Sequence, residues 1–388
     1  MKWRYWMWGG LGVVALFLMG GGGWLLSLPP APAAAAAAPI PQNEIEATLA
    51  ALKPPKRQRP LIAVIGINNA TEVTDYLMPL GILRRADVAD VVALATEPGP
   101  VRLYPALTVE PEATAAEFDA QHPEGADYVV VPAMSRDDDP AALEWIRSQA
   151  QKGAIVVSVC AGAKVVAAAG LLDGKRATTH WYYLDELREE HPIRYVPDRR
   201  LVVDRGVATT TGITASMPMM LTLIEAIAGR DKAETVARDM GLPHWDARHR
   251  SGAFTFTRPF ALAAIGNSLA VWNYEELGIE LQPGVDEVSL ALVADAWSRT
   301  YRSHVVTFAA TSAVESQSGL RILPDEVTMV RSRDKVLPSI GNERPARALD
   351  RTLQEIEVRY GAHTAEVVAM QLEYPGSSSA LTRVLAGR

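Results

Sequence analysis

The sequence has very little cysteine: Cys160 is the only one in 388 residues. A single thiol cannot form a disulfide within the chain, and it cannot supply a cysteine-based zinc site. It is therefore either an inert buried residue or a reactive group, and the surrounding sequence must decide which.

An excess of basic residues is also missing. Lys and Arg number 38 against 45 Asp and Glu, which gives a net charge of −7. Proteins that bind nucleic acid need a basic face to meet the phosphates. We therefore expect nucleic acid not to be a partner.

Charged residues are absent from Tyr5 to Leu28, directly after Lys2 and Arg4. Roughly 20 apolar residues are enough to cross a bilayer. Residues 1–28 are therefore predicted to be a single-pass anchor in the inner membrane, with the rest of the chain in the periplasm. The alternative is a cleaved signal peptide and secretion, because Ala33–Ala38 offers small-residue cleavage sites.

The length suggests two domains with appendages. Residues 29–59 are rich in Pro and Ala and are predicted to be a semi-rigid spacer with a short helix at 43–52. From residue 60 apolar runs typical of buried strands alternate with helical segments, which predicts an α/β domain with a parallel sheet covered on both faces, up to about residue 250. These runs are 61–65, 90–95, 128–131, 154–159 and 207–210.

Cys160 lies where the fourth of these runs ends and a helix is expected to begin. Gly162 lets the chain bend tightly, so the pattern is that of a nucleophile at a strand-to-helix turn. The helix N-terminus is expected to favour the thiolate and lower its pKa, and the backbone N–H of Ala161 is placed to stabilise an oxyanion. The alternative is a cysteine packed in the core.

Several motifs in order resemble the DJ-1/PfpI superfamily, whose fold is like that of the class I glutamine amidotransferases. The resemblance spans roughly residues 60–245 and is closest to the branch of isonitrile hydratases and the N-terminal domains of AraC-type regulators. It implies a flavodoxin-like three-layer α/β/α sandwich. The motifs that carry it are 71–79, 160–162, 169–174, 177–181 and 209–215.

By this resemblance Cys160 is the nucleophile, and Asp75 is the acidic residue beside it that acts as general acid or base. His180 matches a histidine that polarises or orients the thiol. The alternatives are a helix-capping role for Asp75 and a structural, hydrogen-bonded role for His180. The resemblance implies neither a metal nor a cofactor.

Two positions depart from the family pattern. Relatives commonly have Pro-Gly-Gly where this chain has Pro132-Ala133-Met134, and a glycine N–H there helps to form the oxyanion pocket. The oxyanion site is therefore expected to be built from the backbone of Ala161, Gly162 and Met134, with Met134 narrowing it. Gly81 also replaces an acidic residue that is frequent in the closest branch.

A truncated second copy of the domain is predicted at 268–380. Glu72-Val73-Thr74 recurs as Glu287-Val288-Ser289, 215 positions later. Further on, 229–237 resembles 361–369 at an offset of only 132. The segment lost between these matches contains the counterpart of Cys160, and Leu290 replaces Asp75, so the second copy cannot hold the same site. It is expected to pack where a partner subunit would sit, as an intramolecular pseudo-dimer; a homo-oligomer is the other possibility.

Two functions remain open. The first is an enzyme in which Cys160 acts on a small electrophile, by hydratase- or amidase-like chemistry. The second is a non-catalytic sensor or scaffold that binds a small molecule or registers oxidation of the thiol. His244, Asp246 and His249 have side chains of the metal-binding type, but they follow the end of a helix and a further ligand nearby is not evident in the sequence, so no metal site is predicted there.

Overall fold

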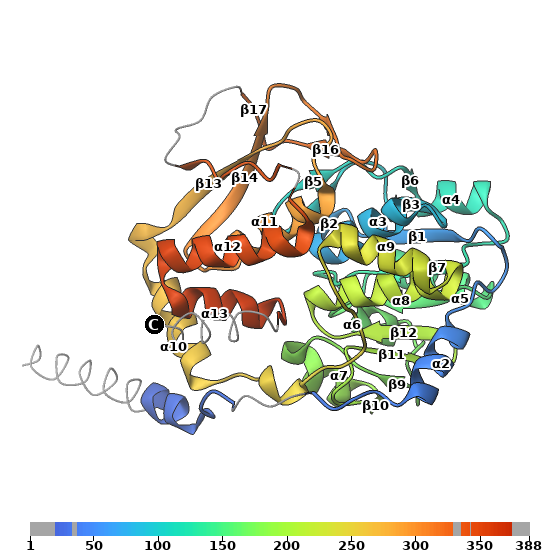
Figure 1. The fold of residues 1–388 in the computed structure, drawn as a ribbon, viewed down its shortest axis with the longest axis horizontal. Coiled ribbons are helices and arrows are strands. Elements are labelled where there is room, and N and C mark those ends of the chain that lie inside the picture. The colour runs from blue at the N-terminus through green and yellow to red at the C-terminus, as the bar shows by residue number, and fades with distance from the viewer. Residues whose placement is uncertain (1–19, 33–36, 329–334, 342, 375–388) are drawn as a thin grey trace, which may run out of the picture.

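The structure is a computed structural model that describes residues 20–32, 37–328, 335–341 and 343–374. Figure 1 shows a larger first part, coloured blue to yellow, and a smaller second part, coloured orange to red, packed beside it.

A seven-stranded sheet forms the centre of the first part, in the order β11-β12-β8-β7-β1-β3-β6. Every neighbouring pair is parallel except β11 and β12. The strands are β1 (Leu61–Gly66), β3 (Asp90–Ala95), β6 (Ala113–Thr114), β7 (Tyr128–Val131), β8 (Ile155–Ser158), β11 (Leu201–Asp204) and β12 (Val207–Thr210).

Helices cover both faces of this sheet. Along β1, Ile62 and Val64 belong to one buried cluster, whereas Leu61, Ala63 and Ile65 belong to another, as the two-residue period of a strand requires. The first cluster includes α3 (Val73–Ala86), α8 (Ser216–Ala228) and α9 (Arg230–Met240), and the second includes α4 (Ala115–Gln121), α5 (Pro140–Gln151), α6 (Gly162–Ala168) and α7 (Leu184–Glu190). The predicted flavodoxin-like, three-layer α/β/α fold is confirmed.

Residues 42–59, predicted as part of a spacer, pack against the first part. Helix α2 (Gln42–Ala51) contacts α8, and Leu52 after it is fully buried. Arg57 forms an ion pair of 2.6 Å with Asp127, whose side chain is completely buried. This segment is therefore fixed to the sheet by an apolar contact and a charged one.

The element order of the second part resembles the start of the first part, while the truncated repeat at 268–380 stays a prediction. Strand β13 (Glu275–Glu280), helix α11 (Glu287–Ser298) and strand β14 (Ser303–Ala309) follow one another like β1, α3 and β3, and both strand pairs are parallel. Strand β17 (Glu326–Val327) pairs with β14 as β6 pairs with β3. Helices α12 (Pro345–Tyr360) and α13 (Ala362–Gln371) follow, and α12 packs on α11 and α13 as α8 packs on α3 and α9.

The two parts meet through helices and through a shared sheet. Helix α11 packs on α3, and a Cβ placed on Gly81 of α3 would lie 2.6 Å from side-chain atoms of Glu287 and Val288. Only glycine allows the helices to approach this closely. A five-stranded sheet in the order β15-β16-β5-β4-β2 joins strands of both parts: β2 (Asn69–Glu72), β4 (Val101–Tyr104), β5 (Thr108–Val109), β15 (Val314–Glu315) and β16 (Arg321–Leu323).

Most of the predicted membrane span lies outside the described residues, which begin at Gly20. Residues 20–27 are helical, but within the described part of the chain no helix has the length and apolar character to cross a bilayer. The anchor therefore stays a prediction.

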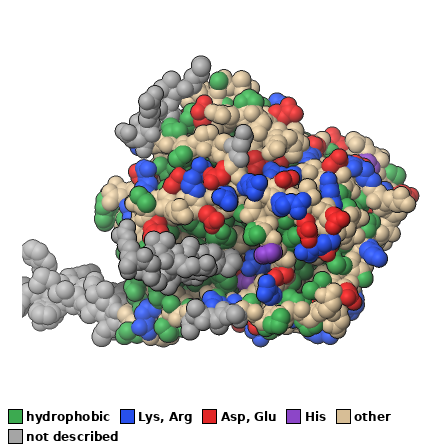
Figure 2. All heavy atoms as spheres, in the orientation of Figure 1, with side chains coloured by type: hydrophobic (Ala, Val, Ile, Leu, Met, Phe, Trp, Pro, Cys, Tyr) green, Lys and Arg blue, Asp and Glu red, His purple; other side chains and the backbone are tan. Residues whose placement is uncertain are grey.

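On the face drawn in Figure 2, basic and acidic side chains are interspersed rather than gathered by sign.

Candidate functional site

Cys160 occupies a strained corner between β8 and α6. Its φ is +56°, a left-handed conformation that costs energy for a residue with a Cβ. The corner is held by two hydrogen bonds: the Cys160 N–H donates to Thr210 Oγ1 (3.1 Å), and Thr179 Oγ1 donates to the Cys160 carbonyl (3.0 Å). The predicted strand-to-helix turn is therefore present, and its strain is supported by two neighbouring segments.

Gly162 makes this corner possible by leaving space for the adjacent strand. A Cβ there would lie 2.2 Å from the carbonyl oxygen of Val131 and 2.9 Å from the backbone of Pro132. The Gly162 N–H is bonded to Val159 O at 2.8 Å, so it is not free to stabilise an oxyanion as predicted. Gly162 thus contributes close packing rather than a donor.

The thiol lines a cavity of about 430 Å³. Cys160 is 5 % exposed, and Ala161, Met134 and His180 share the wall with it. Within the described chain, the backbone N–H groups of Ala161 and Met134 donate to no oxygen. Met134 lines the cavity and its amide is available to a ligand, whereas the Ala161 N–H is hydrogen-bonded to the Cys160 sulfur.

Asp75 is completely buried in the first turn of α3, but it does not cap the helix. Glu72 is the cap: its Oε2 accepts the Asp75 N–H (2.6 Å) and Thr74 Oγ1 (2.7 Å). Asp75 Oδ2 accepts the N–H of Ala133 (3.1 Å), and its Oδ1 has no partner among the described residues. The capping alternative for Asp75 is thus excluded, and one of its oxygens is left for chemistry.

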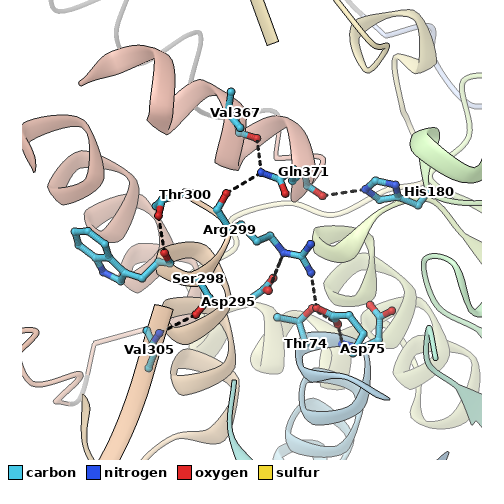
Figure 3. Close-up of polar contacts among 12 residues, drawn as sticks. Thr74, Asp75, His180, Asp295, Ser298, Arg299, Thr300, Val305, Val367 and Gln371 are labelled. Carbon is cyan, nitrogen blue, oxygen red and sulfur yellow. Dashed lines mark hydrogen bonds and ion pairs between the residues drawn. The ribbon is translucent and has the colours of Figure 1, made fainter. Parts of the chain in front are cut away.

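Arg299, at the end of α11, brings the second part of the chain into this site. Its Nε lies 2.7 Å from Asp295 Oδ1, and its Nη2 lies 2.8 Å from Glu72 Oε1. Figure 3 shows the side chain running from α11 to the first turn of α3. Arg299 also lines the Cys160 cavity, so the second part supplies a cation that the sequence did not reveal.

His180 is fully engaged by backbone groups. Its Nε2 donates to the carbonyl of Gln371 (2.9 Å), which fixes the proton on Nε2, and its Nδ1 accepts the N–H of Tyr182 (3.2 Å). Gln371 in turn donates through Nε2 to the carbonyl of Arg299 (2.9 Å), as Figure 3 shows. These bonds agree with the structural alternative for His180, which lines the cavity without a free ring nitrogen.

The predicted lowering of the Cys160 pKa is wrong. Burial raises the pKa of the thiol well above its usual value, and the nearby carboxyls of Asp75 and Glu72 raise it further, while the Ala161 N–H lowers it only in part. Helix α6 has only seven residues, so its N-terminus is too weak to reverse these effects. The thiol is therefore protonated at rest and needs a base to become a nucleophile.

Burial also keeps protons on the acids of the site. It raises the pKa of Glu72, Asp75 and Asp295 to about 7 in each case, with Arg299 opposing the shift. A carboxyl that titrates near neutral pH can both accept and return a proton. Asp75 therefore suits the predicted role of general acid and base.

These shifts predict that the fold loses stability as the pH rises from about 4 to about 7. The unfolded carboxyls ionise near their ordinary pKa, whereas the folded ones hold their protons up to about 7, so the folded state binds more protons in this window. Asp75→Asn removes one such group and should reduce the fall by about 1.4 kcal/mol or more. Urea unfolding of both proteins at about pH 5 and about pH 7 tests this. An equal fall in the free energy of unfolding of the wild type and of Asp75→Asn between these pH values would contradict the prediction.

Part of this set of residues recurs at the counterpart position in the second part, although Arg84 pairs there with Glu112 and not with Glu287. Glu287 and Arg84 match Glu72 and Arg299 at the offset of 215, and both line another cavity together with Ser318. The Arg84 Nη1 donates to Ser318 O (3.3 Å), so this arginine also reaches across the junction. Leu290 replaces the acid there, and no thiol is present. The offset of 215 also relates Arg84 to Arg299, so the repeat is the signal in the sequence that points to Arg299.

Comparison with known proteins adds three kinds of match. The model of the DJ-1/PfpI family matches residues 62–226. The isonitrile hydratase of Pseudomonas putida is 48 % identical over 99 residues, 26 % of this chain and 42 % of that protein. The HTH-type transcriptional regulator CdhR of Pseudomonas aeruginosa is 36 % identical over 103 residues, 26 % of this chain and 31 % of that protein. The chain thus spans less than half the length of these relatives.

A solved structure is also similar, that of a mutant of a DJ-1 superfamily protein from Salmonella typhimurium. It is 25 % identical, with a TM-score of 0.43, and the match covers 48 % of this chain and all of that one.

Proposed function

Because residues 62–226 form a DJ-1/PfpI family domain, we propose that the chain uses Cys160 as a cofactor-independent nucleophile in hydratase-like chemistry on a small electrophile. The observation that carries this is the strained thiol in a cavity lined by Glu72 and Arg299, with the fully buried Asp75, whose pKa is raised to about 7, close enough to raise the pKa of the thiol. The 48 % identity with an isonitrile hydratase supports this class of electrophile.

For an isonitrile, the steps balance without a co-reactant other than water. The Cys160 sulfur forms a bond to the terminal carbon, and the thiol proton passes through Asp75 to that carbon, which gives a thioimidate. Water then adds to the same carbon, the S–C bond breaks, the sulfur regains a proton, and a formamide leaves. Asp75 carries the proton in both steps, which its raised pKa allows.

The remaining groups stabilise charge in these steps. The N–H of Met134 faces a partly negative nitrogen or oxygen, in the manner of an oxyanion hole. Arg299 pairs with Glu72, so that the charge of this second carboxylate opposes ionisation of the sulfur less than an unpaired one would.

The test is hydration of cyclohexyl isocyanide by the full chain, with the formamide measured by chromatography. Cys160→Ser should abolish turnover, and Asp75→Asn should lower kcat by about 10²–10⁴-fold, as expected for loss of a general acid and base. His180→Asn is the matched control, because its ring nitrogens are already bonded to backbone groups; its kcat should fall less than that of Asp75→Asn. Full activity in Cys160→Ser would refute the proposal.

A second function, a ligand or redox sensor, is favoured by two specific observations. Met134 lines the cavity at a position where the resemblance to the family implies glycine, and the Cys160 pKa is raised rather than lowered. A sensor would show no turnover of isonitrile, carbonyl or amide compounds, while a bound small molecule would protect Cys160 from alkylation. The same activity assay therefore separates the two functions.

A further inference from the structure

A second cavity, of about 380 Å³, lies beside the one that holds Cys160. The segment from Thr179 to Tyr183 separates them: Thr179, Trp181 and Tyr182 line the second cavity, whereas His180 and Tyr183 line the first. Its other walls come from the connecting segment 249–256 and from Glu373, after α13. We call this space the junction cavity, because the first part, the connector and the second part meet there.

Three buried polar atoms at this cavity have no hydrogen-bond partner among the described residues. They are Thr211 Oγ1, His249 Nδ1 and Glu373 Oε2, on residues that are 3 %, 4 % and 2 % exposed. Buried polar atoms are nearly always hydrogen-bonded, so three atoms without such a bond around one cavity are placed to bind a ligand, although Glu373 Oε2 also has an ion-pair contact of 3.4 Å with His249 Nε2. The other oxygen of Glu373 is used, since it accepts the N–H of Trp181 at 2.8 Å.

The unbonded atoms are mainly acceptors. Burial lowers the pKa of His249, so its ring is neutral, and its Nε2 lies 3.4 Å from Glu373 Oε2. With the proton on the nitrogen that faces the carboxylate, Nδ1 presents a lone pair. The cavity therefore offers three acceptors: a carboxylate oxygen, an imidazole nitrogen and a hydroxyl. Such a set suits a ligand with several N–H or O–H donors.

Aromatic rings form much of the remaining wall. Phe254 is stacked on His249, with centroids 5.1 Å apart and planes 6° from parallel. Trp181, Tyr195 and Phe256 also line the cavity. Aromatic faces attract cations, and they shelter an apolar group equally well. Arg200 interacts electrostatically with Glu373, while its Nε donates to the carbonyl of Arg248 (3.4 Å).

We propose that the junction cavity is a binding site for a small organic cation that carries N–H donors beside an apolar group, such as a primary ammonium. The N–H groups bond to Glu373, His249 and Thr211, and the apolar part lies against the aromatic rings. The site is separate from the Cys160 cavity and does not depend on the function proposed for it.

Calorimetric titration of the full chain with benzylammonium, and with benzyl alcohol as a neutral molecule of the same shape, tests this. Benzylammonium should bind at least ten times more tightly than the alcohol. Glu373→Gln should lower the affinity for benzylammonium at least tenfold, and Thr211→Val should lower it a few-fold. Asp185→Asn is the control, because this second carboxyl of the cavity is exposed; its affinity should stay within twofold of the wild type.

Three results would overturn the proposal. Absence of benzylammonium binding to the wild type would mean that water alone fills the cavity. Equal affinity for the alcohol would show an apolar pocket without cation recognition. If Asp185→Asn and Glu373→Gln lowered the affinity for benzylammonium equally, the binding would depend on general surface charge and not on the carboxyl inside the cavity. Should Glu373→Gln fail to fold, judged by circular dichroism, Thr211→Val and the comparison of the two ligands decide the matter.

Discussion

Replacing Gly162 by alanine is expected to destabilise the fold by at least about 3 kcal/mol, the upper part of the range for overpacked cores. The added Cβ would lie 2.2 Å from the carbonyl oxygen of Val131 and 2.9 Å from two backbone atoms of Pro132. These are backbone atoms of β7 and its end, so they cannot rotate away like a side chain. Either the strand or the Cys160 corner must move.

Urea unfolding of Gly162→Ala measures this loss, and alkylation of Cys160 by iodoacetamide reports whether the corner has shifted. Gly266→Ala in α10 (Arg258–Leu269) is the control, because no atom lies within 4 Å of its added Cβ. Alanine should there stabilise the helix by about 0.5–1 kcal/mol. A Gly162→Ala protein with wild-type stability would show that the approach of α6 to β7 is looser than described.

Removal of the Arg299 guanidinium by Arg299→Met should cost about 3–5 kcal/mol, the usual cost of leaving a buried charge without its partner. Asp295 is completely buried and Glu72 nearly so, and Arg299 is bonded to both. At about pH 8 the carboxylates would face each other without a cation, whereas near pH 5 both are protonated. The deficit should therefore be largest at high pH and shrink as the pH falls.

Unfolding at these two pH values measures the stability of the Arg299→Met protein. Alkylation of Cys160 should also slow down, because the guanidinium favours the thiolate. Arg84→Met is the matched control: it removes the counterpart arginine, whose partner Glu112 is 41 % exposed, and it leaves the Cys160 cavity intact. Similar deficits in the two variants, or a deficit of Arg299→Met independent of pH, would contradict the role assigned to Arg299.

The arrangement of the first part followed from local patterns. Apolar runs marked β1, β3, β7, β8 and β12, and the small residues after the fourth run marked the corner at Cys160. The N-cap Asp139 before Pro140 correctly located the start of α5. Such features depend on neighbours in the sequence, so they can be read from it.

The chemistry of the site could not be predicted in the same way, because it depends on distant contacts. The cap of α3 is Glu72 rather than Asp75, and the ring of His180 is occupied by Gln371, 191 positions away. The predicted direction of the Cys160 pKa shift was wrong, because burial and two nearby carboxyls raise this pKa more than the N-terminus of a short helix can lower it. The ion pair between Arg299 and Glu72 could not be predicted either, because it depends on how α11 packs on α3.

The seat of α11 on α3 also limits how copies of this protein can associate. Gly81 is in contact with Glu287 and Val288, so the outer side of α3 is already occupied within the same polypeptide. A second molecule could bind to this side of α3 only if the C-terminal part were displaced, and Glu72 would then lose its ion pair with Arg299. Any stable self-assembly is therefore expected to use some other surface and to carry one complete thiol centre in each molecule.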